Sequence, residues 1–115
     1  MAQSASVLLF SYGTLRQPEV QLANYRRLLE GEPDSLSGYR LVPVEIGDPD
    51  VVRISGKKVH TIAVASGDPE DRITGMVLAL SEAELAVTDA YETKDYARIE
   101  ATLDSGRSAW VYVAV

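Results

Sequence analysis

The sequence predicts a single α+β domain dominated by sheet, curled or barrel-like, with about six or seven short strands and two helices. Short apolar or alternating stretches, each bounded by turn residues, recur along most of the chain and are typical of strands. Two other stretches carry the spacing of amphipathic helices. The 115 residues suit one compact domain, in which a sheet of this size must curl to protect its edges.

The first two elements are predicted from the N-terminal quarter of the chain. Residues 6–12 are apolar and β-branched and predict a buried strand, which Gly13 ends. Residues 18–29 predict a helix, because their apolar residues recur at helical spacing and Pro18 suits a first turn. A glycine and a proline shortly after this segment, at Gly31 and Pro33, end it.

The middle of the chain predicts strands separated by acidic turns. The strands fall at residues 35–44, 51–54, 59–65 and 73–80. Two Asp-Pro turns, in residues 47–50 and 67–71, lie between them. Such acidic turns could bind a cation, but the same residues are ordinary in solvated turns, and the sequence favours that interpretation.

The last third of the chain predicts a capped helix and two strands. Ser81 and Glu84 form a capping box. The spacing that follows predicts a buried helix face made of Ala83, Ala86, Val87, Ala90 and Tyr91. Residues 96–103 then alternate between two sides, and residues 109–115 form a closing strand after the Ser105-Gly106 turn.

Composition excludes several classes of function. The net charge of −6, without a dense basic cluster, argues against a nucleic-acid partner. The chain has no cysteine and one histidine, His60, which excludes thiol nucleophiles and multi-histidine metal sites. No cofactor motif is present, so no cofactor is expected. No stretch suits a signal peptide or membrane span, and we expect a cytoplasmic protein without a membrane partner.

Residues 10–16 are the first candidate for chemistry. Here a strand runs into Gly13, then a short loop, then a helix. Such a loop presents free backbone N–H groups, and glycine lets a ligand approach the backbone closely. It therefore suits a carboxylate or a developing oxyanion, although a plain strand–turn–helix connection explains the same residues.

Glu92 is the second candidate, at the C-terminal end of the second predicted helix. The helix C-terminus is a region of negative potential, so a partly buried carboxylate there would have a raised pKa, useful for proton transfer. A solvated glutamate in a loop is the alternative. The residues alone do not decide between the two.

Two segments in order resemble the γ-glutamylcyclotransferase-like superfamily, which includes the AIG2-like proteins and the γ-glutamylamine cyclotransferases. Residues 12–15 (Tyr-Gly-Thr-Leu) follow an apolar strand and are similar to the family's YGTL/YGSL loop. Residues 89–98 resemble its downstream pattern of an acidic residue, a glutamate and a Tyr-x-Arg strand. Gly75 stands where the family has a V-x-G strand.

The resemblance implies a small mixed β-barrel with flanking helices and a cofactor-independent enzyme. Its partner would be a small-molecule γ-glutamyl substrate, cyclised to 5-oxoproline with release of an amine. Glu92 would be the general acid/base. Substrate-binding residues would be Tyr12, Gly13, Thr14 and Leu15, with Tyr96 and Arg98 beside the pocket. A non-catalytic ligand-binding module on the same scaffold, and a purely structural or interaction domain, are the alternative hypotheses.

Overall fold

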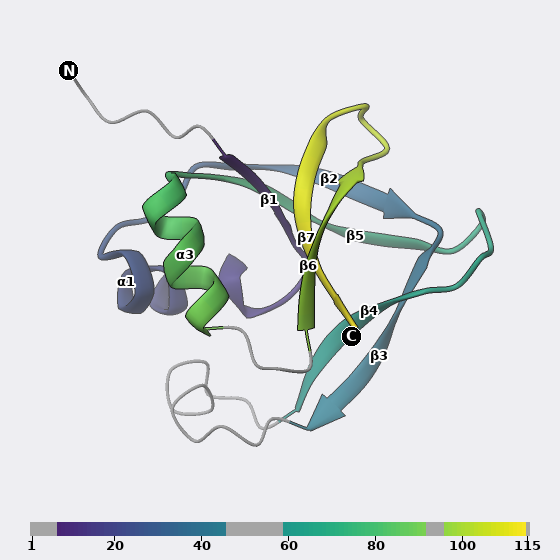
Figure 1. Cartoon of the computed structure of the whole chain (residues 1–115), viewed down its shortest axis with the longest axis horizontal. Helices are drawn as coiled ribbons and strands as arrows, with labels where there is room; N and C mark the ends of the chain where they lie inside the picture. The colour runs from purple at the N-terminus through teal and green to yellow at the C-terminus, as the bar shows by residue number, and fades with distance from the viewer. Residues whose placement is uncertain (1–6, 46–58, 92–95, 115) are drawn as a thin grey trace.

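The computed structural model describes residues 7–45, 59–91 and 96–114, so the predicted strand at residues 51–54 lies outside the described residues. Within these ranges the chain forms one mixed sheet with two helices and a short 3₁₀ turn (Figure 1). The elements are, in order, β1 (Val7–Ser11), η1 (Thr14–Arg16), α1 (Pro18–Tyr25), β2 (Gly31–Ser37), β3 (Tyr39–Glu45), β4 (Val59–Ala65), β5 (Arg72–Leu80), α3 (Glu82–Tyr91), β6 (Tyr96–Thr102) and β7 (Ser108–Ala114). No helix among these is long and apolar enough to cross a membrane.

The seven strands form a sheet that branches at β7. Along the main path the order is β2-β5-β1-β7-β4-β3, and β6 pairs with β7 outside this path. One edge of β7 is paired along its length with β6. The other edge is parallel to β1 near Trp110, opposite Leu9, and parallel to β4 near Val113, opposite Ala63. Strands β1 and β4 therefore occupy successive parts of the same edge of β7 and diverge between them.

The α+β class and the seven strands confirm the prediction, but the sheet does not close into a barrel by strand pairing. Instead the turn between β6 and β7 docks on the edge strand β2. The Asp104 N–H donates to the Ser35 carbonyl at 2.9 Å, and the Asp104 carboxylate accepts from the hydroxyls of Ser35 and Ser37. Hydrogen bonds from Ser35 and Ser37 hold the pKa of Asp104 below its ordinary value, against the desolvation that raises it. One backbone hydrogen bond and two from serine side chains thus hold this turn to β2 in place of strand pairing.

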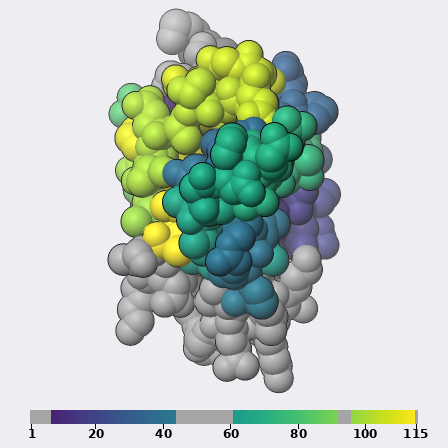
Figure 2. Space-filling view, turned by 90° about the vertical axis from the view of Figure 1, so that its right-hand side faces the viewer, coloured from purple at the N-terminus to yellow at the C-terminus, as the bar shows by residue number. Residues whose placement is uncertain are grey.

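Both faces of β1 are covered, which explains its continuous apolar run. Leu9 faces the helices and Phe10 faces the inside of the curled sheet. The core on the helix side contains Leu9, Leu15, Val20, Leu78, Leu80, Leu85, Tyr91 and Tyr112. The opposite core comes from strands and their connections: Phe10, Tyr12, Leu36, Ala63, Ile73, Val77, Leu103, Ala109, Val111 and Val113. Viewed from the side away from the helices, the β6–β7 hairpin (yellow-green) covers the upper surface and the β4–β5 connection (teal) lies below it (Figure 2).

Two element boundaries differ from those predicted. Helix α1 ends at Tyr25, not at residue 29, because Arg26 adopts a left-handed conformation with φ 59°. The single strand predicted at residues 35–44 is two strands, β2 and β3, divided at Gly38 with φ +86°. Pro33 lies inside β2, where it is tolerated because β2 is an edge strand.

In α3 the capping box is present, but the predicted buried face is wrong except at Tyr91. The Glu84 N–H donates to the Ser81 hydroxyl at 3.1 Å, and the Ser81 N–H donates to the Glu84 carboxylate at 2.9 Å. The buried residues of the helix are Leu85, Thr88 and Tyr91, whereas Ala83, Ala86, Val87 and Ala90 are exposed. The larger side chains determine which face packs, since three small alanines bury little apolar area.

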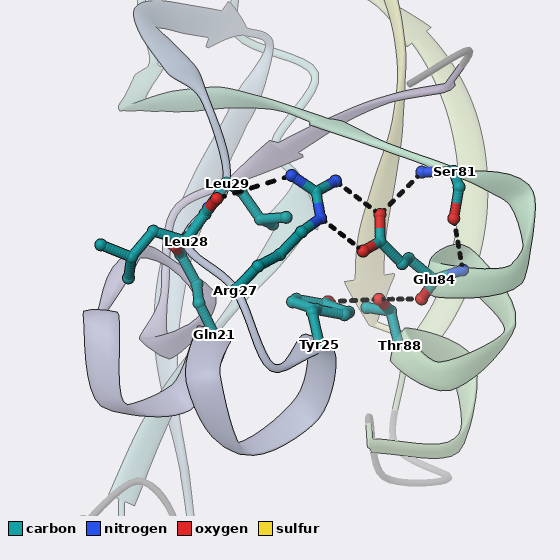
Figure 3. A network of polar contacts seen from close by, with 8 residues as sticks. All are labelled: Gln21, Tyr25, Arg27, Leu28, Leu29, Ser81, Glu84 and Thr88. Carbon is teal, nitrogen blue, oxygen red and sulfur yellow. Dashed lines mark hydrogen bonds and ion pairs between the residues drawn. The ribbon is translucent and has the colours of Figure 1, made fainter. Parts of the chain in front are cut away.

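Polar contacts fasten α1 to α3 (Figure 3). The Arg27 guanidinium forms a fork with the Glu84 carboxylate, with both N–O distances 2.7 Å. The Tyr25 hydroxyl contacts that of Thr88, which in turn donates to the Glu84 carbonyl. The hydrogen bond from Arg27, with smaller contributions from Ser81, lowers the pKa of Glu84 to about 2 against the effect of its burial.

Glu84 is therefore predicted to make stability depend on acid pH. Its pKa is lower in the folded protein than the ordinary 4.5, so its contribution is complete above pH 4.5 and is lost as the pH falls toward about 2. We expect the free energy of unfolding of the Glu84→Gln variant, measured by urea titration, to decline less steeply over this range than that of the wild type. Glu82→Gln, on the exposed side of the helix, should keep the wild-type slope. Equal slopes for wild type and Glu84→Gln would contradict the prediction.

Candidate active site

A cavity of about 650 Å³ lies at the C-terminal end of β1. Its walls come from the β1–η1 connection and from strands β3 to β7, which bring together distant parts of the sequence. The lining residues are Phe10, Ser11, Tyr12, Gly13, Thr14, Leu15, Arg16, Gln17, Pro18, Leu41, Thr61, Met76, Tyr96 and Tyr112. Arg16 is the only charged side chain among these described residues.

The position of the loop at residues 12–15 depends on close contact between β1 and β5. Ser11 pairs with Met76, next to Gly75 on β5. A Cβ atom added at Gly75 would lie 2.4 Å from the Ser11 carbonyl oxygen and 3.0 Å from the Phe10 ring. Packing therefore requires glycine at position 75. Without a side chain there, β5 can lie close to the last residues of β1, directly before the loop.

Tyr12 fills the place where β1 and β4 diverge along β7. Its hydroxyl donates to the Tyr112 carbonyl of β7 at 2.5 Å and accepts from the Ala63 N–H of β4 at 3.0 Å. The side chain is 7% exposed and belongs to the core inside the curled sheet. Tyr12 thus joins two strands and forms one wall of the cavity.

The carbonyl oxygens of residues 12–15 all point toward the chain that follows them. Arg16 donates from Nη2 to the Tyr12 carbonyl at 2.9 Å and from Nε to the Gly13 carbonyl at 3.1 Å. The Thr14 carbonyl accepts from the Gln17 N–H at 2.9 Å. The Leu15 carbonyl accepts from Gln21 Nε2 at 2.8 Å. Each carbonyl of the loop is therefore held by a donor in residues 16–21.

This arrangement sets the direction of the N–H groups. In a trans peptide the N–H of one residue points opposite to the carbonyl of the residue before it. The N–H groups of Gly13, Thr14 and Leu15 are accordingly turned away from Arg16 and Gln17. Within the part of the chain that the structure describes, none of these three N–H groups has a hydrogen-bond acceptor. Three backbone donors without an acceptor, in residues that line the cavity, suit an anionic or carbonyl ligand.

Gly13 leaves space beside these N–H groups. Its φ of −128° is negative, so it lies outside the left-handed region. Apart from its chain neighbours, a Cβ atom at Gly13 would meet no heavy atom of the described residues within 4 Å. The absent side chain therefore leaves space in the cavity.

Thr14 and Leu15 anchor the loop to the helices. Both are buried, and Leu15 packs in the core on the helix side. The Thr14 hydroxyl lies 3.0 Å from the hydroxyl of Tyr91, the last residue of α3. The loop is thereby tied to the end of α3.

The structure brings Tyr96 to the cavity but places Arg98 elsewhere. Tyr96 lines the cavity, and its hydroxyl donates to the Thr61 carbonyl at 3.0 Å. Arg98 pairs with Asp89 through two hydrogen bonds of 2.9 and 3.0 Å, and its guanidinium lies 4.4 Å from the centre of the Trp110 ring.

Asp89 links Arg98 indirectly to the cavity wall. The Tyr112 hydroxyl donates to the Asp89 carboxylate at 2.6 Å, and Tyr112 lines the cavity.

Glu92 lies outside the described residues, between α3 and β6, so its catalytic role stays a prediction. Among the described residues, no group of three or more acidic or histidine side chains is arranged to hold a metal ion.

Arg16 and Gln21 are the functional residues that sequence reasoning missed. Arg16 stands within the loop segment already identified, and only the structure shows that its guanidinium holds two carbonyl oxygens. Gln21 is 5% exposed, and it follows the fully buried Val20. A glutamine within the apolar positions of a helix was the available indication that it satisfies buried backbone groups.

Comparisons with known proteins agree with this fold. The family model described as gamma-glutamyl cyclotransferase, AIG2-like, matches residues 9–115, and the chain belongs to this family. The search of curated proteins found no match.

Among solved structures, a solution structure from Arabidopsis thaliana is 26% identical with a TM-score of 0.70, over 100% of this chain and 64% of the other. The chain thus spans about two-thirds of that protein. A second Arabidopsis thaliana solution structure is 18% identical (TM-score 0.72), over 95% of this chain and 68% of the other. A structure described as gamma-glutamyl cyclotransferase is 17% identical (TM-score 0.69), over 98% of this chain and 68% of the other. These last two likenesses show the shared fold.

The Tyr12 hydroxyl is expected to contribute to stability. Tyr12→Phe removes both of its hydrogen bonds and leaves the Tyr112 carbonyl and the Ala63 N–H without this partner. We expect the variant to lower the free energy of unfolding by about 2 kcal/mol, measured by chemical denaturation. Tyr39→Phe is the control, because the Tyr39 hydroxyl makes no hydrogen bond in the described part of the chain. A Tyr12→Phe variant as stable as the wild type would show that the bridge is unimportant.

Proposed function

We propose that the protein is a cytoplasmic γ-glutamyl cyclotransferase that converts a γ-glutamyl amine or amide to 5-oxoproline and a free amine. The family of the chain supports this reaction class. The observation that carries the proposal is the loop at residues 12–15, whose carbonyls are held by residues 16–21. Its three N–H groups and the open space at Gly13 suit a ligand with a carboxylate or an oxyanion.

The reaction joins two parts of one substrate. The α-ammonium group loses a proton, and the resulting amine attacks the γ-carbonyl carbon to form a five-membered ring. The carbonyl oxygen becomes an oxyanion in the tetrahedral intermediate. The bond to the leaving amine then breaks, and that amine takes up a proton. Because the nucleophile is tethered to its target, correct folding of the substrate in the cavity supplies much of the rate enhancement.

We assign the proton transfers to Glu92 as general base and then general acid. Two described neighbours on either side of this residue support the assignment. Tyr91, before it, contacts Thr14 of the loop, and Tyr96, after it, lines the cavity. We further assign substrate binding to residues 12–15 and Tyr96. Arg98 would act from behind the cavity wall, through Asp89 and Tyr112.

The direct test measures the release of 5-oxoproline by mass spectrometry. Purified protein is incubated with γ-glutamyl amines, γ-glutamyl dipeptides and ε-lysine conjugates. We expect turnover by the wild type, and a loss of about 100-fold or more in Glu92→Gln, because general acid–base groups contribute roughly this much. Glu100→Gln, on the exposed side of β6, is the matched control and should retain activity.

Two outcomes of this test would change the proposal. A fully active Glu92→Gln variant would exclude Glu92 as the acid/base. A wild type that binds 5-oxoproline without turning over any γ-glutamyl compound would favour the ligand-binding module instead.

Gly13→Ala tests whether the open space in the cavity belongs to the ligand. Apart from its chain neighbours, the added methyl group meets no heavy atom of the described residues within 4 Å, so we expect the free energy of unfolding to change by less than about 1 kcal/mol. The same methyl group would occupy the space where the ligand approaches the loop. We therefore expect at least about a tenfold loss of kcat/KM, or of 5-oxoproline affinity, in steady-state and calorimetric measurements. Unchanged binding would mean that the ligand does not approach Gly13.

A further inference from the structure

Arg16 contacts the loop at residues 12–15 in a way that no other side chain of the described chain does. Its guanidinium donates to two consecutive carbonyl oxygens, those of Tyr12 and Gly13, at 2.9 and 3.1 Å. The Arg16 N–H also reaches the Gly13 carbonyl, at 3.2 Å. One residue thus fixes the orientation of two successive peptide planes.

The orientation of these two planes determines what the loop can bind. The plane containing the Tyr12 carbonyl also contains the Gly13 N–H, and the next plane contains the Gly13 carbonyl and the Thr14 N–H. Rotating either plane would direct a carbonyl oxygen, with its partial negative charge, to the side of the N–H groups. A loop rotated in this way would repel a carboxylate instead of binding it.

We propose that Arg16 is a positioning residue that holds the Gly13 and Thr14 N–H groups toward the cavity and so makes the cavity selective for a carboxylate. The identity of that carboxylate, the one carried by a γ-glutamyl compound and by 5-oxoproline, rests on the proposed function. Arginine suits this task because its donors form a rigid planar fork, which can reach two carbonyl oxygens at once.

Gln21 completes the arrangement from α1. Its side-chain nitrogen donates to the Leu15 carbonyl at 2.8 Å, and its oxygen accepts from the Leu29 N–H at 2.9 Å. Figure 3 shows Gln21 beside the network that joins α1 to α3. Gln21 is buried, whereas Arg16 is exposed. Arg16 is therefore the residue that can be replaced with little cost to folding.

A positioning role differs from a direct attraction of charge. Arg16 is the charged side chain among the described residues that line the cavity, so a lysine in its place would keep the positive charge. Lysine presents a point charge without the planar fork, and it cannot hold both carbonyls in the same geometry. Arg16→Lys and Arg16→Gln together separate the two roles, and Arg40→Lys on β3 is the exposed control.

The experiment combines NMR of the free protein with two ligand titrations. The ¹⁵N–¹H signals and relaxation of Gly13, Thr14 and Leu15 report the loop without any ligand. L-5-oxoproline and its carboxamide, which lacks the carboxylate, are then titrated. In both Arg16 variants we expect displaced and more mobile signals at residues 13–15, and at least about tenfold weaker binding of 5-oxoproline. Carboxamide binding and the control variant should be unaffected, with melting temperatures within about 3 °C of the wild type.

Two results would overturn the proposal. Unperturbed signals at residues 13–15 in both Arg16 variants would show that the guanidinium does not position the loop. Full 5-oxoproline affinity in Arg16→Lys, with loss in Arg16→Gln, would show that charge alone matters. If the wild type bound neither probe, the proposed ligand would be wrong, and the signals of the free protein would still decide whether Arg16 positions the loop.

Discussion

The hydroxyl of Tyr12 is the interaction on which the arrangement of this sheet depends. Strands β1 and β4 share one edge of β7 in succession, so the backbone ladder is interrupted where the first gives way to the second. The Tyr12 hydroxyl joins the strands at that point, because it donates a hydrogen bond to β7 and accepts one from β4. The divergence of the two strands opens the cavity, and the same side chain prevents them from separating further. Fold and cavity thus arise from one branch point.

The carbonyl oxygens of the loop after Tyr12 are bonded to the protein, and its N–H groups have no acceptor among the described residues. Donors in residues 16–21 occupy its carbonyl oxygens, and the contact at Gly75 fixes the end of β1 before it. The contact of Thr14 with Tyr91 ties it to α3. A loop held from three directions pays little entropy on binding, because its N–H groups are already oriented. This rigidity is what electrostatic stabilisation of an oxyanion requires.

The sequence was informative wherever the determinant was local. The apolar strand before Gly13, the capping box of Ser81 and Glu84, and the loop at residues 12–15 could each be predicted from neighbouring residues. The buried face of α3 could not, because its orientation follows from contacts with α1 and the sheet, across distant parts of the chain. Likewise, no local pattern shows that Arg16 holds two carbonyl oxygens, or that Tyr12 joins β7 to β4. Glu92 could be proposed only from its place after a helix together with the family resemblance.

The way β3 and β4 are attached has a consequence for the width of the cavity. These two strands pair closely with each other. They join the rest of the sheet through the short parallel contact between Ala63 and Val113 and through the hydroxyls of Tyr12 and Tyr96. They also carry Leu41 and Thr61 into the cavity wall. Strands attached by these few contacts have a lower free energy of local opening than the strands around β1, which are paired on both edges. The β3–β4 side is therefore the most easily displaced wall of the cavity, whereas the loop at residues 12–15 keeps its geometry.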